Sequence, residues 1–413
     1  MYFKNPGGRI VAIDDPIQIE KYRKIPGFVA LDHDDQVKHM NERIELVKRA
    51  KQAEAEALAG ITPEDKAGVY FFTVSQHYQA DGYGVASACI MRELSRLGVD
   101  VKLSYRDQKV GILFHNPYSI AQMRSDFRVI YTMFESDKIP EDWYPYLEMA
   151  DLILVPSQWC ADTFTRAGYK AEVLPLGYDD LSYSFVDREN KRENNKTFNF
   201  LHYNAFNIRK GFPEVFKAFV EEFQPDEPVR LILKTTQTQF QIPAPLRGLE
   251  QQYPNIKVIS GRIPSTEMQD LMADSDCFVF PSRGEGFGMT PLEVMATGMP
   301  AIIPNAHGMT EYFDPECMYE VEVDSMCPAL YSRYKGVDVG KMVVCSIEDL
   351  KRQMRYVYEH QAEALAKGEA ASEHVQKWTL RNTAKRLKEI ILDLQSRPSP
   401  ERKLKDVLTL EKV

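Results

Sequence analysis

The chain alternates short apolar runs with segments of helical pattern, and this alternation limits the folds open to it. Each run has the length of a buried strand, and turn residues separate it from the next segment. The first series of expected strands covers residues 69–74, 99–105, 111–115, 128–134, 151–155 and 172–175. Helices are expected at 85–97 and from Ser157 onward. Strands that alternate with helices form parallel βαβ units, so the pattern predicts an α/β fold with a doubly wound sheet.

A second series of the same kind follows a polar stretch at 187–197, which we expect to be a linker. Its strands are expected at 198–203, 229–234, 256–260, 277–280 and 301–303, and its helices at 213–222, 265–274, 291–297, 346–366 and 372–395. Two such series predict two Rossmann-like domains that face each other across a cleft, where ligands commonly bind.

The length of 413 residues leaves room for more than these two domains. We expect an N-terminal accessory module, an N-terminal Rossmann-like domain, a C-terminal Rossmann-like domain, and a final helix with a tail that closes on the N-terminal domain. These parts cover residues 1–66, 67–186, 187–370 and 371–413. In the first part, residues 8–13 read as a short strand, and helices are expected from Asp15 and over 36–59.

Composition narrows the classes of function. Lys and Arg number 51 against 60 Asp and Glu, and the resulting charge of -9 argues against a general polyanion binder. The six cysteines form no CxxC pair, which is typical of reduced thiols in a cytosolic protein. No run reaches the roughly 18 apolar residues of a membrane span, and the start lacks the layout of a signal peptide. We therefore expect a cytoplasmic protein.

The stretch 280–301 carries the strongest chemical signal. A strand is expected to end at Phe280, and a helix to begin at Pro291. Three glycines between them let the backbone pass close to a ligand: Gly284, Gly286 and Gly288. The free N–H groups at a helix N-terminus favour an anion such as a diphosphate.

Two glutamates, Glu285 and Glu293, belong to the same stretch and have seven residues between them. Carboxylates accept hydrogen bonds from sugar hydroxyls, so both are candidate contacts to a sugar or a ribose. Glu293 has a structural alternative, because Thr290 to Glu293 also fits a capping box with Pro291 as the first helical residue.

This spacing resembles the E-x7-E signature of retaining glycosyltransferases with two Rossmann domains, the GT-B type, in the large family that includes sucrose and mannosyl transferases. The resemblance extends over about residues 68–395. Further stretches are similar to that family at 132–137, 155–159, 174–179 and 207–211. It implies a nucleotide-sugar donor bound mainly by the C-terminal domain, an acceptor bound mainly by the N-terminal domain, and no obligatory metal or other cofactor.

The resemblance also implies roles for single residues. Glu285 would contact the donor sugar, Glu293 would hold the ribose, and Arg209 with Lys210 would neutralise the diphosphate as it leaves. The backbone along the donor would be that of Gly286, Phe287, Gly288, Met289 and Thr290.

The expected cation pair departs from the family in one position. The family usually has an Arg five residues before the clamp Lys, where this chain has Ala205. Arg209 or Lys234 must then take over, and Arg262 is a further candidate for donor binding. A solvated helix entry is the structural alternative for Arg209 and Lys210.

A second glycine site lies in the loop expected at 80–87, where the resemblance places Gly82, Tyr83 and Gly84 over the donor phosphates and the acceptor. The same glycines nearly match a dinucleotide fingerprint with Asp100 or Asp107 as the ribose acid, which would suit an NAD-dependent oxidoreductase. A plain tight turn is the structural alternative.

Other polar residues are weaker candidates. Three lie at the carboxyl ends of N-terminal strands, and each is either an acceptor contact or a satisfied polar group: His77, His115 and Glu135. Asp274 and Asp276 look like an Asp-x-Asp metal site, but Asp is also an ordinary turn residue before a strand. We expect no metal there, and His202 and His307 carry less signal still.

The resemblance thus implies an enzyme that transfers a sugar from a nucleoside diphosphate sugar, a UDP-sugar in the first place, to a hydroxyl without a metal. Family membership implies retention of anomeric configuration. Residues 1–66 resemble leader modules of bacteriophage proteins, so one alternative is a phage enzyme that modifies hydroxymethylated DNA bases or a virion protein. The acceptor class stays open among small molecules, glycans, lipids, proteins and modified DNA. A non-catalytic binding or scaffold protein is the remaining alternative.

Overall fold

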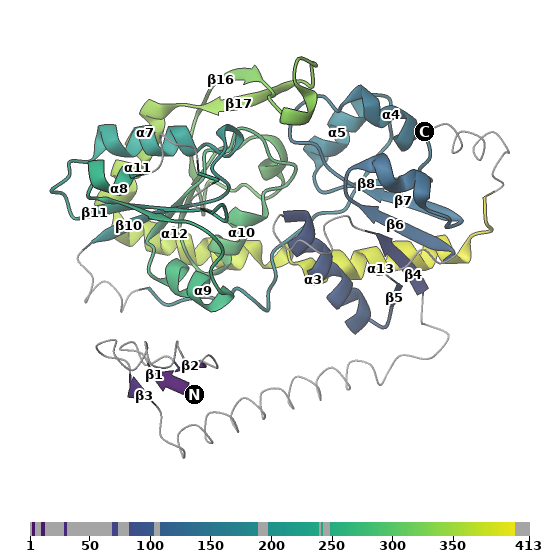
Figure 1. Ribbon diagram of the computed structural model, residues 1–413, viewed down its shortest axis with the longest axis horizontal. Coiled ribbons are helices and arrows are strands. Elements are labelled where there is room, and N and C mark those ends of the chain that lie inside the picture. The colour runs from purple at the N-terminus through teal and green to yellow at the C-terminus, as the bar shows by residue number, and fades with distance from the viewer. Residues whose placement is uncertain are drawn as a thin grey trace. The chain divides into compact units, whose positions relative to one another are not determined.

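The computed structural model describes residues 2–4, 10–12, 29–30, 68–72, 82–102, 108–188, 197–238, 241–242 and 248–400 (Figure 1). The chain divides into two compact units, Met1–Asp65 and Lys66–Val413. The described part of the first unit is a three-stranded antiparallel sheet in the order β2-β1-β3, formed by β1 Tyr2–Lys4, β2 Ile10–Ala12 and β3 Val29–Ala30. The helices expected from Asp15 and over 36–59 lie outside the described residues.

The second unit contains two parallel sheets, as the alternating pattern predicted. We call the part around the first sheet the N-lobe; its strand order is β5-β4-β6-β7-β8-β9. The strands are β4 Gly68–Phe72, β5 Asp100–Lys102, β6 Val110–Phe114, β7 Phe127–Tyr131, β8 Leu152–Val155 and β9 Glu172–Val173. Its helices are α3 Gly82–Arg96, η2 Pro117–Gln122, η3 Glu141–Trp143, α4 Tyr144–Leu147 and α5 Gln158–Arg166.

The other sheet forms the C-lobe, with the strand order β12-β11-β10-β13-β14-β15. The strands are β10 Phe198–Tyr203, β11 Val229–Lys234, β12 Ile256–Ile259, β13 Cys277–Val279, β14 Ala301–Ile303 and β15 Tyr319–Glu320. Its helices are η4 Ile208–Lys210, α7 Phe212–Glu222, α8 Leu249–Gln252, α9 Ser265–Ala273, α10 Met289–Ala296, η6 His307–Glu311, α11 Ile347–Glu359 and α12 Gln361–His374. The order reverses between β10 and β13, and ligands bind at such switch points.

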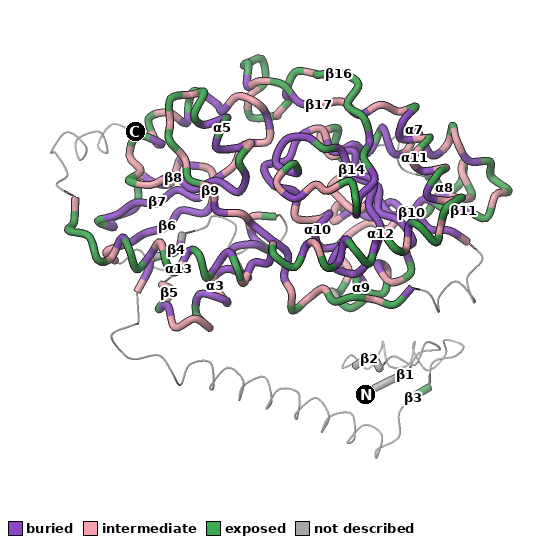
Figure 2. The backbone as a smooth tube through the Cα atoms, turned by 180° about the vertical axis from the view of Figure 1, so that it is seen from behind, coloured by how far each residue is buried: buried purple, intermediate pink, exposed green. Residues whose placement is uncertain are grey.

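The central strands of both sheets are buried on both faces, which explains their continuous apolar runs (Figure 2). All described residues of β6 and β7 are buried, and β13 and β14 are buried throughout. Among the described residues, no helix combines the length and the apolar character that a membrane crossing needs.

The last helix, α13 Leu380–Ser396, follows η8 Val375–Lys377 and returns to the N-lobe, where it packs against α3 (Figure 1). Lys388 Nζ donates to the carbonyl of Leu97 at 2.8 Å, and Gln395 Nε2 donates to the carbonyl of Gly68 at 2.7 Å. The chain thus crosses between the lobes twice, once before β10 and once before α13.

Several of the expected elements differ from the structure. The single helix predicted over 372–395 is wrong, because α12 ends at His374 and α13 begins only at Leu380. The single helix predicted over 346–366 is wrong, because the chain turns at His360, between α11 and α12. The turn lets α11 pack on α7 while α12 packs on α10. The linker expected at 187–197 lies mostly outside the described residues. At its start, Arg188 is only 3% exposed and donates to the carbonyls of Met272 and Thr297.

No element is expected from the sequence between 304 and 345, yet the structure has η6, β15 and an antiparallel hairpin there. The strands β16 Val323–Pro328 and β17 Lys341–Cys345 form an antiparallel hairpin, and η7 Ser332–Tyr334 lies in the segment that joins them. Five of the six residues of β16 are exposed, so the strand lacks the apolar run that predicts a buried strand.

We expect a variant that lacks residues 1–65 to fold, because residues 66–413 form a compact unit of their own. Its far-ultraviolet circular dichroism should keep the mixed α/β signature, and its thermal unfolding should stay cooperative. An insoluble product, or one that unfolds without a cooperative transition, would show that the first unit is required for the fold.

Candidate active site

A cleft with a volume of about 370 Å³ lies between the lobes at the carboxyl ends of their strands. The C-lobe contributes the loops after β10 and β13 and the start of α10, and the N-lobe contributes the loop after β7 and the first turn of α3. The expected site residues that line it are Gly82, Tyr83, Glu135, Arg209, Lys210, Glu285, Gly286, Phe287, Gly288, Met289, Thr290 and Glu293. Most of the expected site therefore converges on the C-lobe switch point.

Two glycines of the 280–288 loop allow the lobes to approach closely. A Cβ atom at Gly286 would lie 2.6 Å from the side chain of Met133, and one at Gly284 would lie 2.1 Å from the carbonyl oxygen of Glu135. Real Cβ atoms do not come this close to other heavy atoms. Ser157 Oγ, at the start of α5, also donates to the carbonyl of Gly286 at 2.8 Å. The loop of the C-lobe therefore rests directly on the N-lobe.

Helix α10 begins earlier than expected, and this excludes the capping box as the role of Glu293. Its N-cap is Gly288, with a φ of 86°, and its first residue is Met289 rather than Pro291. Thr290 lies inside the helix and caps nothing, so the capping-box interpretation is wrong. Glu293 lies in the second turn, is 8% exposed and lines the cleft.

Two cations meet the carboxylate of Glu285. Lys210 Nζ lies 2.7 Å from Glu285 Oε1, and Arg209 Nη1 lies 3.3 Å from the same oxygen. Ser282 Oγ donates to it at 2.6 Å. The side chains of Arg209 and Lys210 are only 20% and 15% exposed, so their interpretation as a solvated helix entry is wrong.

The short helix η4 presents these two cations. Asn207 caps it, because its side-chain oxygen accepts a hydrogen bond from the backbone N–H of Lys210 at 3.0 Å. Gly211, at a φ of 75°, then turns the chain into α7. The Arg-Lys pair therefore stands on a capped turn at the switch point.

Burial and charge act in opposite directions on the two cleft glutamates. Burial alone would raise the pKa of Glu285, but Lys210 and Arg209 outweigh it and lower the pKa to about 2. Burial raises the pKa of Glu293 to about 7, because no cation compensates for it there. Burial also lowers the pKa of Lys210, an effect that Glu285 opposes. One carboxylate of the pair is therefore firmly ionised, and the other is readily protonated.

His307, which carried little signal in the sequence, holds the loop of Glu285. Its Nδ1 accepts from the backbone N–H of Glu285 at 3.2 Å, and its Nε2 donates to the carbonyl of Ser282 at 3.0 Å. Burial lowers its pKa to about 4, so the ring is neutral and keeps this tautomer at pH 7. Among the described residues it is the one non-glycine residue with a positive φ, 45°. No spacing in the sequence links His307 to Glu285, which precedes it by 22 residues.

The second glycine site is helical. Gly82, Tyr83 and Gly84 form the first turn of α3, so the expected loop at 80–87 is wrong over its described residues. Gly82 and Tyr83 line the cleft, whereas Gly84 is buried beneath it. Asp107, one of the two ribose acids of the dinucleotide interpretation, lies outside the described residues.

Several expected site residues do not reach the cleft. Lys234 is buried and donates to the carbonyls of Thr235 and Gly261, at 2.8 and 2.6 Å, and burial lowers its pKa to about 8. Arg262 is exposed and lies outside the cleft lining. His115 packs against the ring of Tyr83 behind the lining, with ring centroids 5.0 Å apart. Of the two substitutes for the cation missing at Ala205, Arg209 is the one in the cleft.

The last acceptor candidate, His77, lies outside the described residues.

The Asp-x-Asp pair makes structural contacts. Asp276 Oδ2 accepts from the backbone N–H of Asn199 at 2.7 Å, and the carbonyl of Asp274 accepts from the Asn199 side chain at 2.8 Å. These bonds fix the turn between α9 and the start of β13.

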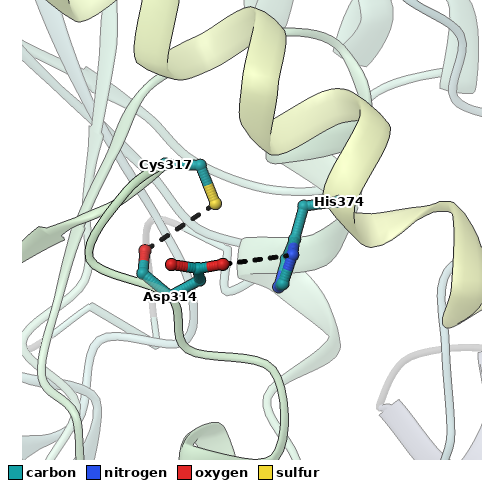
Figure 3. Close-up of side chains that lie close together, drawn as sticks. All are labelled: Asp314, Cys317 and His374. Atoms are coloured by element: carbon teal, nitrogen blue, oxygen red, sulfur yellow. Dashed lines mark hydrogen bonds and ion pairs between the residues drawn. The ribbon is translucent and has the colours of Figure 1, made fainter.

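Three side chains of types that can bind a metal, Asp314, Cys317 and His374, lie close together outside the cleft lining (Figure 3). His374 Nδ1 lies 3.6 Å from Asp314 Oδ2, and its Nε2 donates to the carbonyl of Tyr312 at 2.8 Å. The thiol of Cys317 lies 3.7 Å from the carbonyl of Asp314. A side-chain contact between His374 and Asp314 and hydrogen bonds to the backbone therefore account for the cluster.

Comparisons with known proteins agree with this geometry. Residues 185–317 match the family described as Glycosyl transferases group 1, so the chain carries such a domain. A putative glycosyltransferase, ORF313 of Acidianus filamentous virus 1, is 26% identical over 185 residues, which are 44% of this chain and 54% of that protein. The chain thus matches about half the length of this viral relative.

Two solved structures resemble the fold. Sucrose-phosphate synthase from Thermosynechococcus elongatus is 14% identical with a TM-score of 0.62, over 80% of this chain and 99% of that one. HepE from Anabaena, solved in complex with UDP-glucose, is 12% identical with a TM-score of 0.58, over 79% and 99% of the two chains. The fold is GT-B, as the sequence predicted.

The pKa of Glu293 predicts a pH-dependent stability. The pKa of Glu293 in the folded protein, about 7, lies above the ordinary value of 4.5. Protonation of this carboxyl therefore stabilises the fold, fully so below pH 4.5, and the stabilisation is lost as the pH rises through 7. Relative to Glu293→Gln, the ligand-free wild type should lose on the order of 3 kcal/mol of unfolding free energy between pH 4.5 and pH 8. Urea unfolding at several pH values measures this, with the exposed Glu316→Gln as control. A pH-independent difference would contradict it.

The strained backbone at His307 predicts an order of stability for two variants. His307→Ala should destabilise by about 2–4 kcal/mol, because it leaves a buried N–H and a buried carbonyl without their partner. His307→Gly loses the same hydrogen bonds but adopts the positive φ freely, so it should be about 1 kcal/mol more stable than His307→Ala. Equal midpoints in urea for the two variants would show that the backbone is unstrained in solution.

Proposed function

We propose that this chain, which carries a glycosyl transferases group 1 domain on a GT-B fold, is an enzyme that transfers a sugar from a UDP-sugar to a hydroxyl acceptor. The transfer proceeds with retention and without a metal. One observation carries the proposal: Arg209, Lys210 and the N-terminus of α10 converge at the C-lobe switch point beside Glu285. The neighbour HepE, solved with UDP-glucose, supports UDP as the nucleotide.

The diphosphate belongs at the start of α10. The first N–H groups of a helix have no partner inside it, and together with the helix dipole they favour an anion. Gly288, Met289 and Thr290 line the cleft at this point, across from the two cations. Glu293, one turn further along α10, is placed to bind the ribose hydroxyls.

Donor binding would redistribute the charges of the cleft. In the free enzyme, Lys210 and Arg209 neutralise Glu285. A diphosphate brings more negative charge and competes for both cations. Glu285 then becomes available to accept hydrogen bonds from hydroxyls of the donor sugar. The ion pairs thus keep buried charges compensated until the substrate arrives.

The chemical step breaks the bond between the anomeric carbon and the diphosphate oxygen, and the diphosphate departs with the bonding electrons. Arg209, Lys210 and the amides of α10 stabilise the charge that grows on it. The acceptor hydroxyl attacks the same face of the oxocarbenium-like centre, and its proton passes to the departing phosphate. Because the departing phosphate itself takes the proton, front-face transfer preserves configuration without a separate general base or a covalent intermediate.

The six cysteines are free thiols, which supports a reducing compartment, and we place the enzyme in the cytoplasm. The viral relative supports a virus-encoded origin. A hydroxymethylated DNA base or a virion protein is therefore the first acceptor to test.

The donor class is tested by thermal shift with UDP-, GDP-, ADP- and TDP-sugars in the presence of EDTA. A ligand at 100 times its Kd stabilises the folded state by about 2.7 kcal/mol, so a UDP-sugar should raise the melting temperature. Hydrolysis or transfer of the same donor should persist in EDTA. Loss of activity in EDTA that Mn²⁺ restores would contradict metal independence, and no shift with any donor would contradict the proposed function.

The diphosphate clamp is tested by Lys210→Ala and Arg209→Ala. Each should lower kcat/KM for the donor by about 100-fold, because a charged partner of the leaving group is lost in a water-poor cleft. Lys217→Ala is the control, since Lys217 is 56% exposed on α7. Wild-type kinetics for both clamp variants would refute the assignment.

A further inference from the structure

The β16–β17 hairpin leaves the C-lobe and reaches the N-lobe (Figure 1). Its base is fixed to the loop of the candidate site, because the backbone N–H of Val343 donates to the carbonyl of Arg283 at 2.9 Å. The segment 329–340 that joins the strands, which we call the hairpin tip, contacts N-lobe residues that follow β6 and β7. The hairpin therefore spans the two lobes beside the cleft.

Polar contacts hold the far end of the tip. The hydroxyl of Tyr334 lies 2.7 Å from that of Tyr118 and accepts from Trp143 Nε1 at 3.0 Å. The guanidinium of Arg333 stacks on the ring of Tyr118 at 4.0 Å. Ser136 Oγ donates to the carbonyl of Val339.

Apolar burial reinforces these contacts. Ala329, Val339 and Met342 are 6%, 1% and 5% exposed, and they belong to the same hydrophobic cluster as Phe134 and Trp143 of the N-lobe. A C-lobe segment thus completes part of the N-lobe core. A tip that rested loosely on the surface would not exclude water in this way.

One residue of the tip reaches the charged network of the cleft. The hydroxyl of Tyr331 donates to Glu135 Oε2 at 3.1 Å, and its ring packs on Phe134 with centroids 4.9 Å apart. The other oxygen of the same carboxylate, Glu135 Oε1, lies 3.4 Å from Arg209 Nη2. Tyr331 and Arg209 therefore contact the two different oxygens of the Glu135 carboxylate.

We propose that Tyr331 is a positioning residue for the leaving-group clamp, which it orients through Glu135. This inference rests on the proposed function. Arg209 Nη1 donates to the carbonyl of Gly284 at 2.6 Å and lies 3.3 Å from Glu285, whereas Nη2 lies 3.4 Å from Glu135. When a diphosphate displaces Glu285, Glu135 still fixes the plane of the guanidinium. The hydroxyl of Tyr331 sets where that carboxylate lies, because the tip that carries it is docked on the N-lobe.

The test compares two single-atom deletions on the same tip. Tyr331→Phe should lower kcat for a UDP-sugar by about tenfold and leave the donor KM within about twofold, because one hydrogen bond to a charged group orients the clamp. Tyr334→Phe removes the contacts to Tyr118 and Trp143 and should change the melting temperature but not kcat. An unchanged kcat in Tyr331→Phe would overturn the proposal.

A double-mutant cycle tests whether Tyr331 acts on Arg209 through the carboxylate of Glu135. Added to Glu135→Gln, the Tyr331→Phe change should cost no further kcat, because Tyr331 acts through Glu135. If the kcat of the double variant instead falls by the product of the two single-variant losses, Tyr331 acts elsewhere and the assignment is overturned.

A readout that needs no substrate separates this inference from the proposed function. Amides of 133–137 and 207–211 should exchange hydrogen faster in Tyr331→Phe than in Tyr334→Phe. If no nucleotide-sugar binds the wild type, the proposed function fails, and the exchange data alone decide whether Tyr331 orders Glu135 and Arg209. If donor turnover is normal in the wild type and both variants exchange alike, the positioning role fails and the proposed function stands.

Discussion

The charge network around Arg209 is the interaction on which the arrangement of the cleft depends. Arg209 contacts Glu285 of its own lobe and Glu135 of the other, and Lys210 completes the pairing. Charged groups that are largely buried are stable only when they are paired and hydrogen-bonded. The two lobes must therefore stay in register for the charges to remain compensated, and a substrate that supplies charge can replace one of the partners.

The shape of the donor loop follows from contacts around it rather than from its own sequence alone. His307 bonds the loop at Ser282 and Glu285, and Ser157 of the N-lobe holds its Gly286 carbonyl. The loop thus has partners in both lobes. Gly284 and Gly286 are required because N-lobe atoms occupy the space where their side chains would stand. A loop held in this way keeps Glu285 fixed without substrate, which reduces the ordering needed on binding.

Besides the chain crossing before β10, two elements of the chain join the lobes: helix α13 and the hairpin tip. Helix α13 packs along α3, whereas the hairpin tip docks next to the cleft itself. The tip shares an apolar cluster with the N-lobe, which makes its separation costly. The hairpin tip therefore ties the C-lobe to the N-lobe directly beside the cleft.

The sequence by itself determined the two parallel sheets and most of the cleft lining, because buried strands give continuous apolar runs and glycine-rich turns after strands give ligand sites. It did not determine the start of α10, the break at His360, or the hairpin, whose exposed strand has no apolar pattern. Only the tertiary structure placed His307 behind Glu285, Tyr331 beside Glu135, and Lys234 away from the cleft. These placements depend on contacts between residues distant in the chain, and no local spacing encodes such contacts.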